Sequence, residues 1–254
     1  MTQPTLPRIA IITGAARGIG LEIATKLALR GDQVILADRL DLAHESAAIL
    51  RSRNLLADSH VADIADARGI ASLLNFVKER YGRLDILINN AGISPKHNGE
   101  KLMTVDTPLS EWQEVVRINL TGPFQMCSAF VPLMKVNGWG RIVSMSSLAG
   151  RTGSKMTASS YSATKAGLIG FSRVLAEEVG REGITVNCIA PGRIETPMSR
   201  ESGAAIQNEY ASRVPVGRLG SPHEIAAAVA FFTSESAGNI TGATLDINGG
   251  VFTN

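Results

Sequence analysis

The sequence predicts an α/β fold: a doubly wound, Rossmann-type sheet of about seven parallel strands with helices on both faces. Short apolar runs alternate with segments whose apolar residues recur every three or four positions, from one end of the chain to the other. Such alternation gives a parallel sheet, because right-handed crossovers return each strand beside its predecessor. No linker, repeat or low-complexity tract divides the chain. We therefore expect residues 1–254 to form a single domain.

The individual elements follow from period and stop signals. The apolar run 8–13 predicts the first strand, and four-residue spacing of Ile19, Ile23 and Leu27 predicts a helix over 18–30. Further strands are expected over 33–38, 56–62, 84–90, 141–146, 184–190 and 243–247, and further helices over 41–52, 66–81, 110–136, 158–181 and 222–235. Pro123 and Pro132 predict a kink or break in the longest helix. The polar insertion before the last helix predicts a substrate lid near 194–215.

Composition excludes several classes of function. The 25 Lys and Arg nearly balance the 23 Asp and Glu, so no basic face for nucleic acid is expected. No apolar run is long enough to cross a membrane, and the first residues lack the pattern of a secretory signal. Two cysteines, Cys127 and Cys188, cannot form a disulfide scaffold or a four-ligand zinc site. We expect a cytoplasmic protein without a metal.

A glycine-rich turn, Thr13 to Gly20, lies between the first strand and the first helix. Glycine permits positive φ and close approach of a ligand, and a helix N-terminus offers free N–H groups to a pyrophosphate. Asp38, at the end of the second strand, is placed to accept hydrogen bonds from ribose hydroxyls. Its charge would repel a 2′-phosphate, which favours NAD. Arg17 and Arg39 could instead hold that phosphate, so NADP stays open.

Tyr161 and Lys165 lie four residues apart on a predicted helix and share a face. An ammonium about 5 Å from a phenol, at an effective dielectric near 20, contributes about 3 kcal/mol, or about 2 pKa units. The charge of an oxidised nicotinamide would act in the same direction. We therefore expect the pKa of Tyr161 to be lowered enough for acid–base chemistry near neutral pH.

With these motifs, the chain resembles the short-chain dehydrogenase/reductase superfamily over nearly its whole length. Six motifs stand in that family's order and spacing: Thr13-Gly14-x-x-x-Gly18-x-Gly20, Asn89-Asn90-Ala91-Gly92, Asn119, Ser146-Ser147, Tyr161-Ser-Ala-Thr-Lys165 and Pro191-Gly192. The nearest branch is that of the bacterial 3-oxoacyl-(acyl carrier protein) reductases. The resemblance implies an NAD(P)-dependent enzyme acting on a secondary alcohol or ketone, and a homotetramer.

The resemblance also implies roles for individual residues. Tyr161 would be the acid or base, Lys165 would lower its pKa and bind the nicotinamide ribose, and Ser147 would hold the substrate oxygen. Asn119 would shape its helix and support a proton-relaying water. The remaining cofactor contacts implied are Gly14, Arg17, Gly18, Ile19, Gly20, Asp38, Arg39, Asp63, Ile64, Asn90, Ala91, Gly92, Pro191, Gly192, Ile194 and Thr196.

Three points stay open. Ser147 precedes Tyr161 by one residue more than is common in the 3-oxoacyl reductase branch, so Ser146 is a rival. Where carrier-protein reductases dock their partner with arginines, this chain has Gly138 and Glu182, which weakens the case for a carrier-bound substrate, although Arg181 beside Glu182 could compensate in part. The segment 94–104, with Lys96, His97 and Lys101, could rim the pocket and favour an anionic or hydroxylated substrate, or be a plain solvated loop. A non-catalytic dinucleotide sensor on the same fold is the alternative function.

Overall fold

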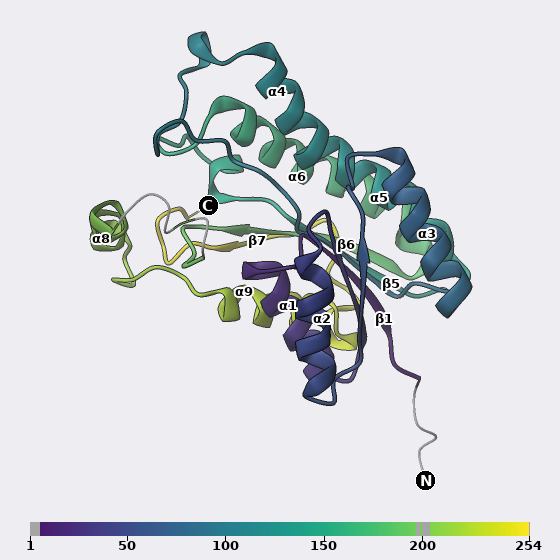
Figure 1. The fold of residues 1–254 in the computed structure, drawn as a ribbon. Coiled ribbons are helices and arrows are strands. Elements are labelled where there is room, and N and C mark those ends of the chain that lie inside the picture. The colour runs from purple at the N-terminus through teal and green to yellow at the C-terminus, as the bar shows by residue number, and fades with distance from the viewer. Residues whose placement is uncertain (1–5, 197–198, 200–203, 254) are drawn as a thin grey trace.

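The computed structural model describes residues 6–196, 199 and 204–253, and within them a parallel sheet of seven strands runs through the centre of the molecule (Figure 1). The spatial order is β3-β2-β1-β4-β5-β6-β7. The strands are β1 (Ile9–Thr13), β2 (Gln33–Asp38), β3 (Ala57–Val61), β4 (Ile86–Asn89), β5 (Gly140–Met145), β6 (Ile184–Pro191) and β7 (Thr244–Ile247). The predicted fold class is confirmed, and the strand bounds differ from prediction by no more than two residues.

Helices cover both faces of the sheet. Figure 1 shows α1 (Gly18–Leu29), α2 (Leu42–Ser52) and α9 (Pro222–Phe232) below it in that view. Above it lie α3 (Ala67–Tyr81), α4 (Leu109–Val116), α5 (Gly122–Lys135) and α6 (Ser159–Val179). Successive strand residues face opposite layers, so Ala10 and Ile12 pack in the core beside α1, and Ile9 and Ile11 pack in the core beside α5. Burial on both faces explains why the strands are apolar throughout.

The expected long helix over 110–136 is interrupted before its first proline. A π-helical turn, Arg117–Thr121, separates α4 from α5, and the Gly122 N–H donates to the Arg117 carbonyl five residues earlier. In an unbroken α-helix, the N–H of residue 123 would donate to the carbonyl of Asn119. Pro123 has no N–H and cannot form this bond. Pro132 lies inside α5 without ending it. The interruption of the helix therefore contains Asn119.

The segment before α9 contains a helix that the sequence did not predict. Helix α8 (Ala204–Arg213) lies at the side of the molecule, beyond the carboxyl ends of the strands (Figure 1). Of the expected lid 194–215, residues 197–198 and 200–203 lie outside the described residues. The sequence of α8 has few apolar residues at helical spacing, so its pattern did not distinguish it from a loop.

The direction of strand order reverses between β1 and β4. Crevices for ligands in doubly wound sheets lie at the carboxyl ends of the strands at this point. Here Thr13 ends β1 and Asn89 ends β4. The Thr13 hydroxyl donates to the Ile88 carbonyl (3.2 Å) and accepts from the N–H groups of Asn90 (3.0 Å) and Ala91 (3.1 Å). A single buried hydroxyl therefore joins the two segments that border the crevice.

Candidate active site

The glycine turn has the shape of an anion cradle. Gly14 and Gly18 adopt positive φ (64° and 62°), and α1 begins at Gly18 with no side chain capping its first N–H groups. A Cβ on Gly20 would lie 2.3 Å from the Gly14 carbonyl oxygen, and one on Gly14 would lie 2.9 Å from the Ala91 Cα. The close approach of these backbones and the uncapped helix end fit a dinucleotide pyrophosphate.

Asn90 holds the turn rather than facing a ligand freely. Its side-chain amide donates to the carbonyls of Thr13 (2.9 Å) and Gly14 (3.1 Å). The turn is therefore tied to the end of β4 as well as to β1. Thr13 and the amide of Asn90 therefore position the turn. The sequence predicted Asn90 as a cofactor contact and did not predict this positioning role for either residue.

The carboxylate of Asp38 is fixed at the rim of the same turn. Its two oxygens accept from the N–H groups of Ala16 (2.9 Å) and Leu40 (3.1 Å). Arg17 and Arg39 are exposed on either side. The structure thus brings together the acid and the two arginines that were considered for the ribose and a 2′-phosphate.

Asp63 lies one strand further out, after β3. Its carboxylate accepts from the Ala65 N–H (2.9 Å) and lies 3.6 Å from the Arg117 guanidinium, which also forms a bidentate pair with Glu114. Ile64 beside it is buried against Gly122, where a Cβ would lie 3.1 Å from the Ile64 Cδ1. Asp63 and Ile64 therefore close the outer side of the crevice.

Tyr161, Ser147 and Lys165 meet at the carboxyl end of β5. Ser147 follows that strand and caps a short helix, accepting from the Ala149 N–H (3.2 Å), and its side chain lies close enough to Tyr161 to act on the pKa of the phenol. Lys165 is buried, its Nζ donates to the Met145 carbonyl (2.7 Å), and it lies 5.5 Å from the centre of the Tyr161 ring. One helical turn of α6 thus presents a phenol and an ammonium to the same space.

The structure contradicts the expected lowering of the Tyr161 pKa. Burial raises the pKa of the phenol above its ordinary value, and the hydrogen bond with Ser147 opposes that rise. Burial instead lowers the pKa of Lys165 to about 8, with Cys188 acting in the opposite direction. Burial acts on the pKa of both groups, and the argument from spacing did not include it.

Asn119 connects the π-turn to the crevice. Its amide accepts from the Ile93 N–H (2.8 Å) and donates to the Ile93 carbonyl (2.9 Å). Gly92 lies between, because a Cβ there would be 3.2 Å from the Asn119 Oδ1 and 3.4 Å from the Lys165 Nζ. The residue after Ala91 must therefore be small for Asn119 and Lys165 to share one wall.

The rival serine has a different role. Ser146 is buried, and its hydroxyl donates to the backbone carbonyl of Lys165 (2.8 Å). Gly150 lies against the same backbone, where a Cβ would be 2.6 Å from the Lys165 carbonyl carbon. Ser146 and Gly150 attach the loop to α6, which leaves Ser147 as the serine beside Tyr161.

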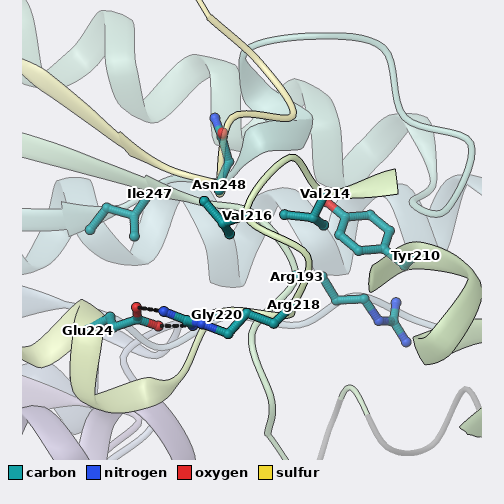
Figure 2. Close-up of a pocket in the computed structure, with 10 residues that line it drawn as sticks. Arg193, Tyr210, Val214, Val216, Arg218, Gly220, Glu224, Ile247 and Asn248 are labelled. Atoms are coloured by element: carbon teal, nitrogen blue, oxygen red, sulfur yellow. Dashed lines mark hydrogen bonds and ion pairs between the residues drawn. The ribbon is translucent and has the colours of Figure 1, made fainter. Parts of the chain in front are cut away.

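The segment after β6 forms the last wall. Pro191 and Ile194 are buried, and the Gly192 N–H donates to the Ile247 carbonyl (2.8 Å). The Thr196 hydroxyl accepts from the Ser199 N–H (3.1 Å), so its side chain already has a partner within the segment 194–215. A cavity of about 120 Å³ lies behind this wall, with the paired Arg218 and Glu224 at one end and Tyr210 at the other (Figure 2). It is lined by neither Tyr161 nor Lys165.

Arg151 and Asp246 are a pair that sequence reasoning missed. The guanidinium forms two contacts with the carboxylate, at 3.2 and 3.1 Å, and joins the loop after Ser147 to β7. The residues are 95 positions apart, so no local pattern marks them.

The described residues contain no group of three His, Cys, Asp or Glu side chains suited to a metal ion. Within the same part of the chain, no helix is both long and apolar enough to span a bilayer.

The pKa of Lys165 predicts a pH-dependent stability. Its folded pKa of about 8 lies below its ordinary value of 10.5, so the unfolded chain holds more protons between those values, and stability should rise with pH through that window. The burial penalty is fully present below pH 8. We expect wild type to gain about 2 kcal/mol relative to Lys165→Met between pH 7.5 and 10, measured by urea denaturation. A pH-independent difference would contradict an ammonium desolvated in the folded protein.

Comparison with known proteins places this geometry in a family. The family model described as Enoyl-(Acyl carrier protein) reductase matches residues 14–252. The chain is 41% identical over 247 residues to the 3-oxoacyl-(acyl-carrier-protein) reductase FabG of Escherichia coli (strain K12), covering 96% of this chain and 97% of the relative.

Two solved structures are similar throughout. A 3-oxoacyl-(acyl-carrier protein) reductase from Brucella melitensis superposes with a TM-score of 0.92 at 38% identity, covering 97% of this chain and 92% of the other. A Brucella melitensis reductase of the same description with bound NAD gives a TM-score of 0.91 at 37% identity, covering 99% and 94%. The chain therefore belongs to the short-chain dehydrogenase/reductase superfamily, as an oxidoreductase that uses a nicotinamide cofactor and acts on a carbonyl or CH–OH group.

Proposed function

We propose that this protein transfers a hydride between NAD and a small secondary alcohol or ketone, such as a 3-oxoacyl thioester, a sugar or a polyol, with Tyr161 as its acid–base group. The observation that carries this proposal is the convergence of Ser147, Tyr161, Lys165 and Asn119 beside the glycine turn, with Gly92 between the last two. A bound nicotinamide supplies or accepts the hydride, and the protein supplies placement and a proton.

In the reducing direction, Tyr161 donates its hydroxyl proton to the carbonyl oxygen as the carbonyl carbon gains a hydride, which gives the alcohol. Ser147 holds that oxygen and hydrogen-bonds the phenol. The Lys165 ammonium offsets the charge left on the phenolate, and only one of its three donors is used by Met145 in the described residues. The Asn119 backbone carbonyl, freed from the helix ladder by Pro123, is available to a proton-carrying water.

The remaining catalytic and cofactor assignments are part of the same proposal. The glycine turn holds the pyrophosphate, Asp38 the adenosine ribose, Asp63 and Ile64 the adenine side, and the segment from Pro191 to Thr196 the nicotinamide. We further propose that 194–215 acts as a lid over the substrate. Tyr210 of α8 supports this because the Arg193 guanidinium lies 5.9 Å from the centre of its ring, which places the helix beside the wall.

The experiment that tests the reaction is a spectrophotometric screen of ketones, sugars and polyols at 340 nm with NADH or NAD. Hydride transfer to at least one class is expected. Complete inactivity, with the cofactor bound normally, would instead favour the dinucleotide-sensing alternative.

The preference for NAD rests on Asp38, whose carboxylate is held rigidly at the rim of the turn. A 2′-phosphate beside it would meet like charge, at a cost that Arg17 and Arg39 only partly offset because both are exposed. We expect NADH to bind at least about tenfold more tightly than NADPH, and Asp38→Asn to reduce that ratio. Fluorescence titration of both cofactors measures it, and tighter binding of NADPH to the wild type would contradict the role given to Asp38.

The substrate is proposed to be free rather than attached to a carrier protein. Gly138, which precedes β5, has no side chain, and Glu182 is acidic and pairs with Lys135 (3.4 Å), so neither supplies the positive charge of the docking arginines in carrier-protein reductases. A cytoplasmic location is part of the proposal, since Cys127 and Cys188 are free thiols.

A homotetramer is also proposed, from apolar side chains on two separate faces. Phe124 of α5 and Val174 of α6 are more than half exposed, and Phe124 packs edge-on against Phe171 of α6. Phe231 of α9 and Leu245 of β7 are exposed on the other side of the molecule. Two self-complementary faces of this kind generate a tetramer with dihedral symmetry.

A further inference from the structure

Three cations gather where the loops that follow β4, β5 and β6 meet. The Lys96 ammonium donates to the Met156 carbonyl, and the Lys101 ammonium donates to the Ser154 carbonyl (3.2 Å). The Arg193 Nη1 lies 3.8 Å from the Met156 sulfur. Lys96 and Arg193 therefore touch the same residue from two sides, although they are almost a hundred positions apart in the chain.

This cluster borders the proposed active site. Lys96 is three residues beyond Ile93, whose backbone is bonded to Asn119, and Met156 is five residues before Tyr161. Arg193 directly follows Gly192, which belongs to the wall after β6. Lys96 and Arg193 are thus each within a few residues of a group placed in the site.

The positive charge of the cluster is not neutralised within the described residues. No carboxylate there lies within 4.0 Å of a charged nitrogen of the three side chains, whereas Arg117, Arg151 and Arg218 all have carboxylate partners. The nearby Glu111 is paired with His97 instead (2.6 Å). The buried Nε of Arg193 has no hydrogen-bond partner among these residues.

The three groups affect one another. Burial is the main cause that lowers the pKa of Lys96, and the charges of Arg193 and Lys101 lower it further. Like charges held together in this way repel, and an anion placed among them would relieve the repulsion and satisfy unused donors.

We propose that Lys96, Lys101 and Arg193 form an oxyanion-binding rim, and that the substrate carries a carboxylate or phosphate group away from its reacting carbonyl. This inference rests on the proposed function and narrows its substrate class. The rim selects an anionic oxo acid or its hydroxy counterpart over neutral ketones and free polyols of similar size.

The chain offers a matched control for this proposal. Lys155 stands between Ser154 and Met156, is exposed, and is not one of the charges that lower the pKa of Lys96. Lys155→Gln removes one positive charge from the same segment without changing the rim. Lys96→Gln removes one of the three charges of the rim but keeps a donor for the Met156 carbonyl, and Lys96→Arg keeps that charge.

The kinetic test compares 3-oxobutanoate with its neutral methyl ester, with NADH as the reductant. We expect wild type to prefer the anion, and the ratio of kcat/KM for anion to ester to fall about tenfold in Lys96→Gln and in Arg193→Gln. Lys155→Gln and Lys96→Arg should retain the wild-type ratio. Equal ratios in Lys96→Gln and Lys155→Gln would overturn the proposal.

A binding test separates this proposal from the proposed reaction. Isothermal titration of malonate and of neutral malonamide needs no turnover, and malonate affinity should fall about tenfold in Lys96→Gln and remain in Lys155→Gln. A parallel titration of inorganic phosphate shows whether the rim binds a phosphate group more tightly than a carboxylate. If the ester is reduced but malonate binds all variants equally, the rim is wrong and the reaction stands. If nothing is reduced but malonate binding follows Lys96, the reaction is wrong and the anion site stands.

Discussion

Tyr161→Phe is expected to lower kcat by about 10²–10⁴-fold while leaving the affinity for NADH unchanged. The phenylalanine keeps the ring that packs between Ser147 and Lys165 but has no proton to give to the substrate oxygen. The Lys165 ammonium remains held by the Met145 carbonyl, so the cofactor side of the crevice should keep its shape. The loss should therefore appear in turnover and not in cofactor binding.

Stopped-flow measurement of hydride transfer and fluorescence titration of NADH would separate these two effects. Tyr81→Phe is a suitable control, because Tyr81 is also a half-buried tyrosine with a bonded hydroxyl, to Asp58, but it ends α3 away from the crevice. Its kcat should stay near that of wild type. Turnover of Tyr161→Phe within threefold of wild type would remove Tyr161 from the chemistry.

Gly20→Ala is expected to abolish tight cofactor binding and to lower the free energy of unfolding by about 1–3 kcal/mol. The new methyl group would lie 2.3 Å from the Gly14 carbonyl oxygen and 2.7 Å from the Asn90 amide nitrogen. That carbonyl cannot simply move, because Asn90 and the positive φ of Gly14 hold it in place. The turn must open, and its N–H groups then no longer converge on a pyrophosphate.

Urea denaturation and NADH titration measure the two effects. Gly180→Ala provides the matched control, because Gly180 has helical dihedral angles and no atom within 4 Å of an added Cβ. It should be neutral or slightly stabilising, by up to about 1 kcal/mol. If Gly20→Ala binds NADH within threefold of wild type, the contact between α1 and Gly14 does not shape the cofactor site.

The sequence was most informative where one short segment sets both structure and chemistry. The strand β2 was predicted over its observed residues, and the glycine turn, Asp38 and the pair of Tyr161 and Lys165 all lie at the edge of the sheet where the motifs place them. Each of these features can be located from the spacing of nearby residues and from the position where a strand ends. Apolar periodicity reveals both.

The sequence was least informative where residues distant in the chain decide the outcome. Pro123 predicted a break in the helix, and the π-turn lies directly before it, but the amide bonds that Asn119 makes to Ile93 could not be read from the sequence. The pKa of Tyr161 depends on burial by surrounding segments, which spacing does not show. Helix α8 has a weak apolar stripe, so its packing near Arg193 was not visible as a pattern.

The last strand links two walls of the site. The Asp246 carboxylate binds Arg151 in the loop that follows Ser147, and the Ile247 carbonyl accepts from the Gly192 N–H. A shift of β7 would therefore displace both walls together, so a substitution in this strand is expected to disturb Ser147 and the segment after β6 at the same time.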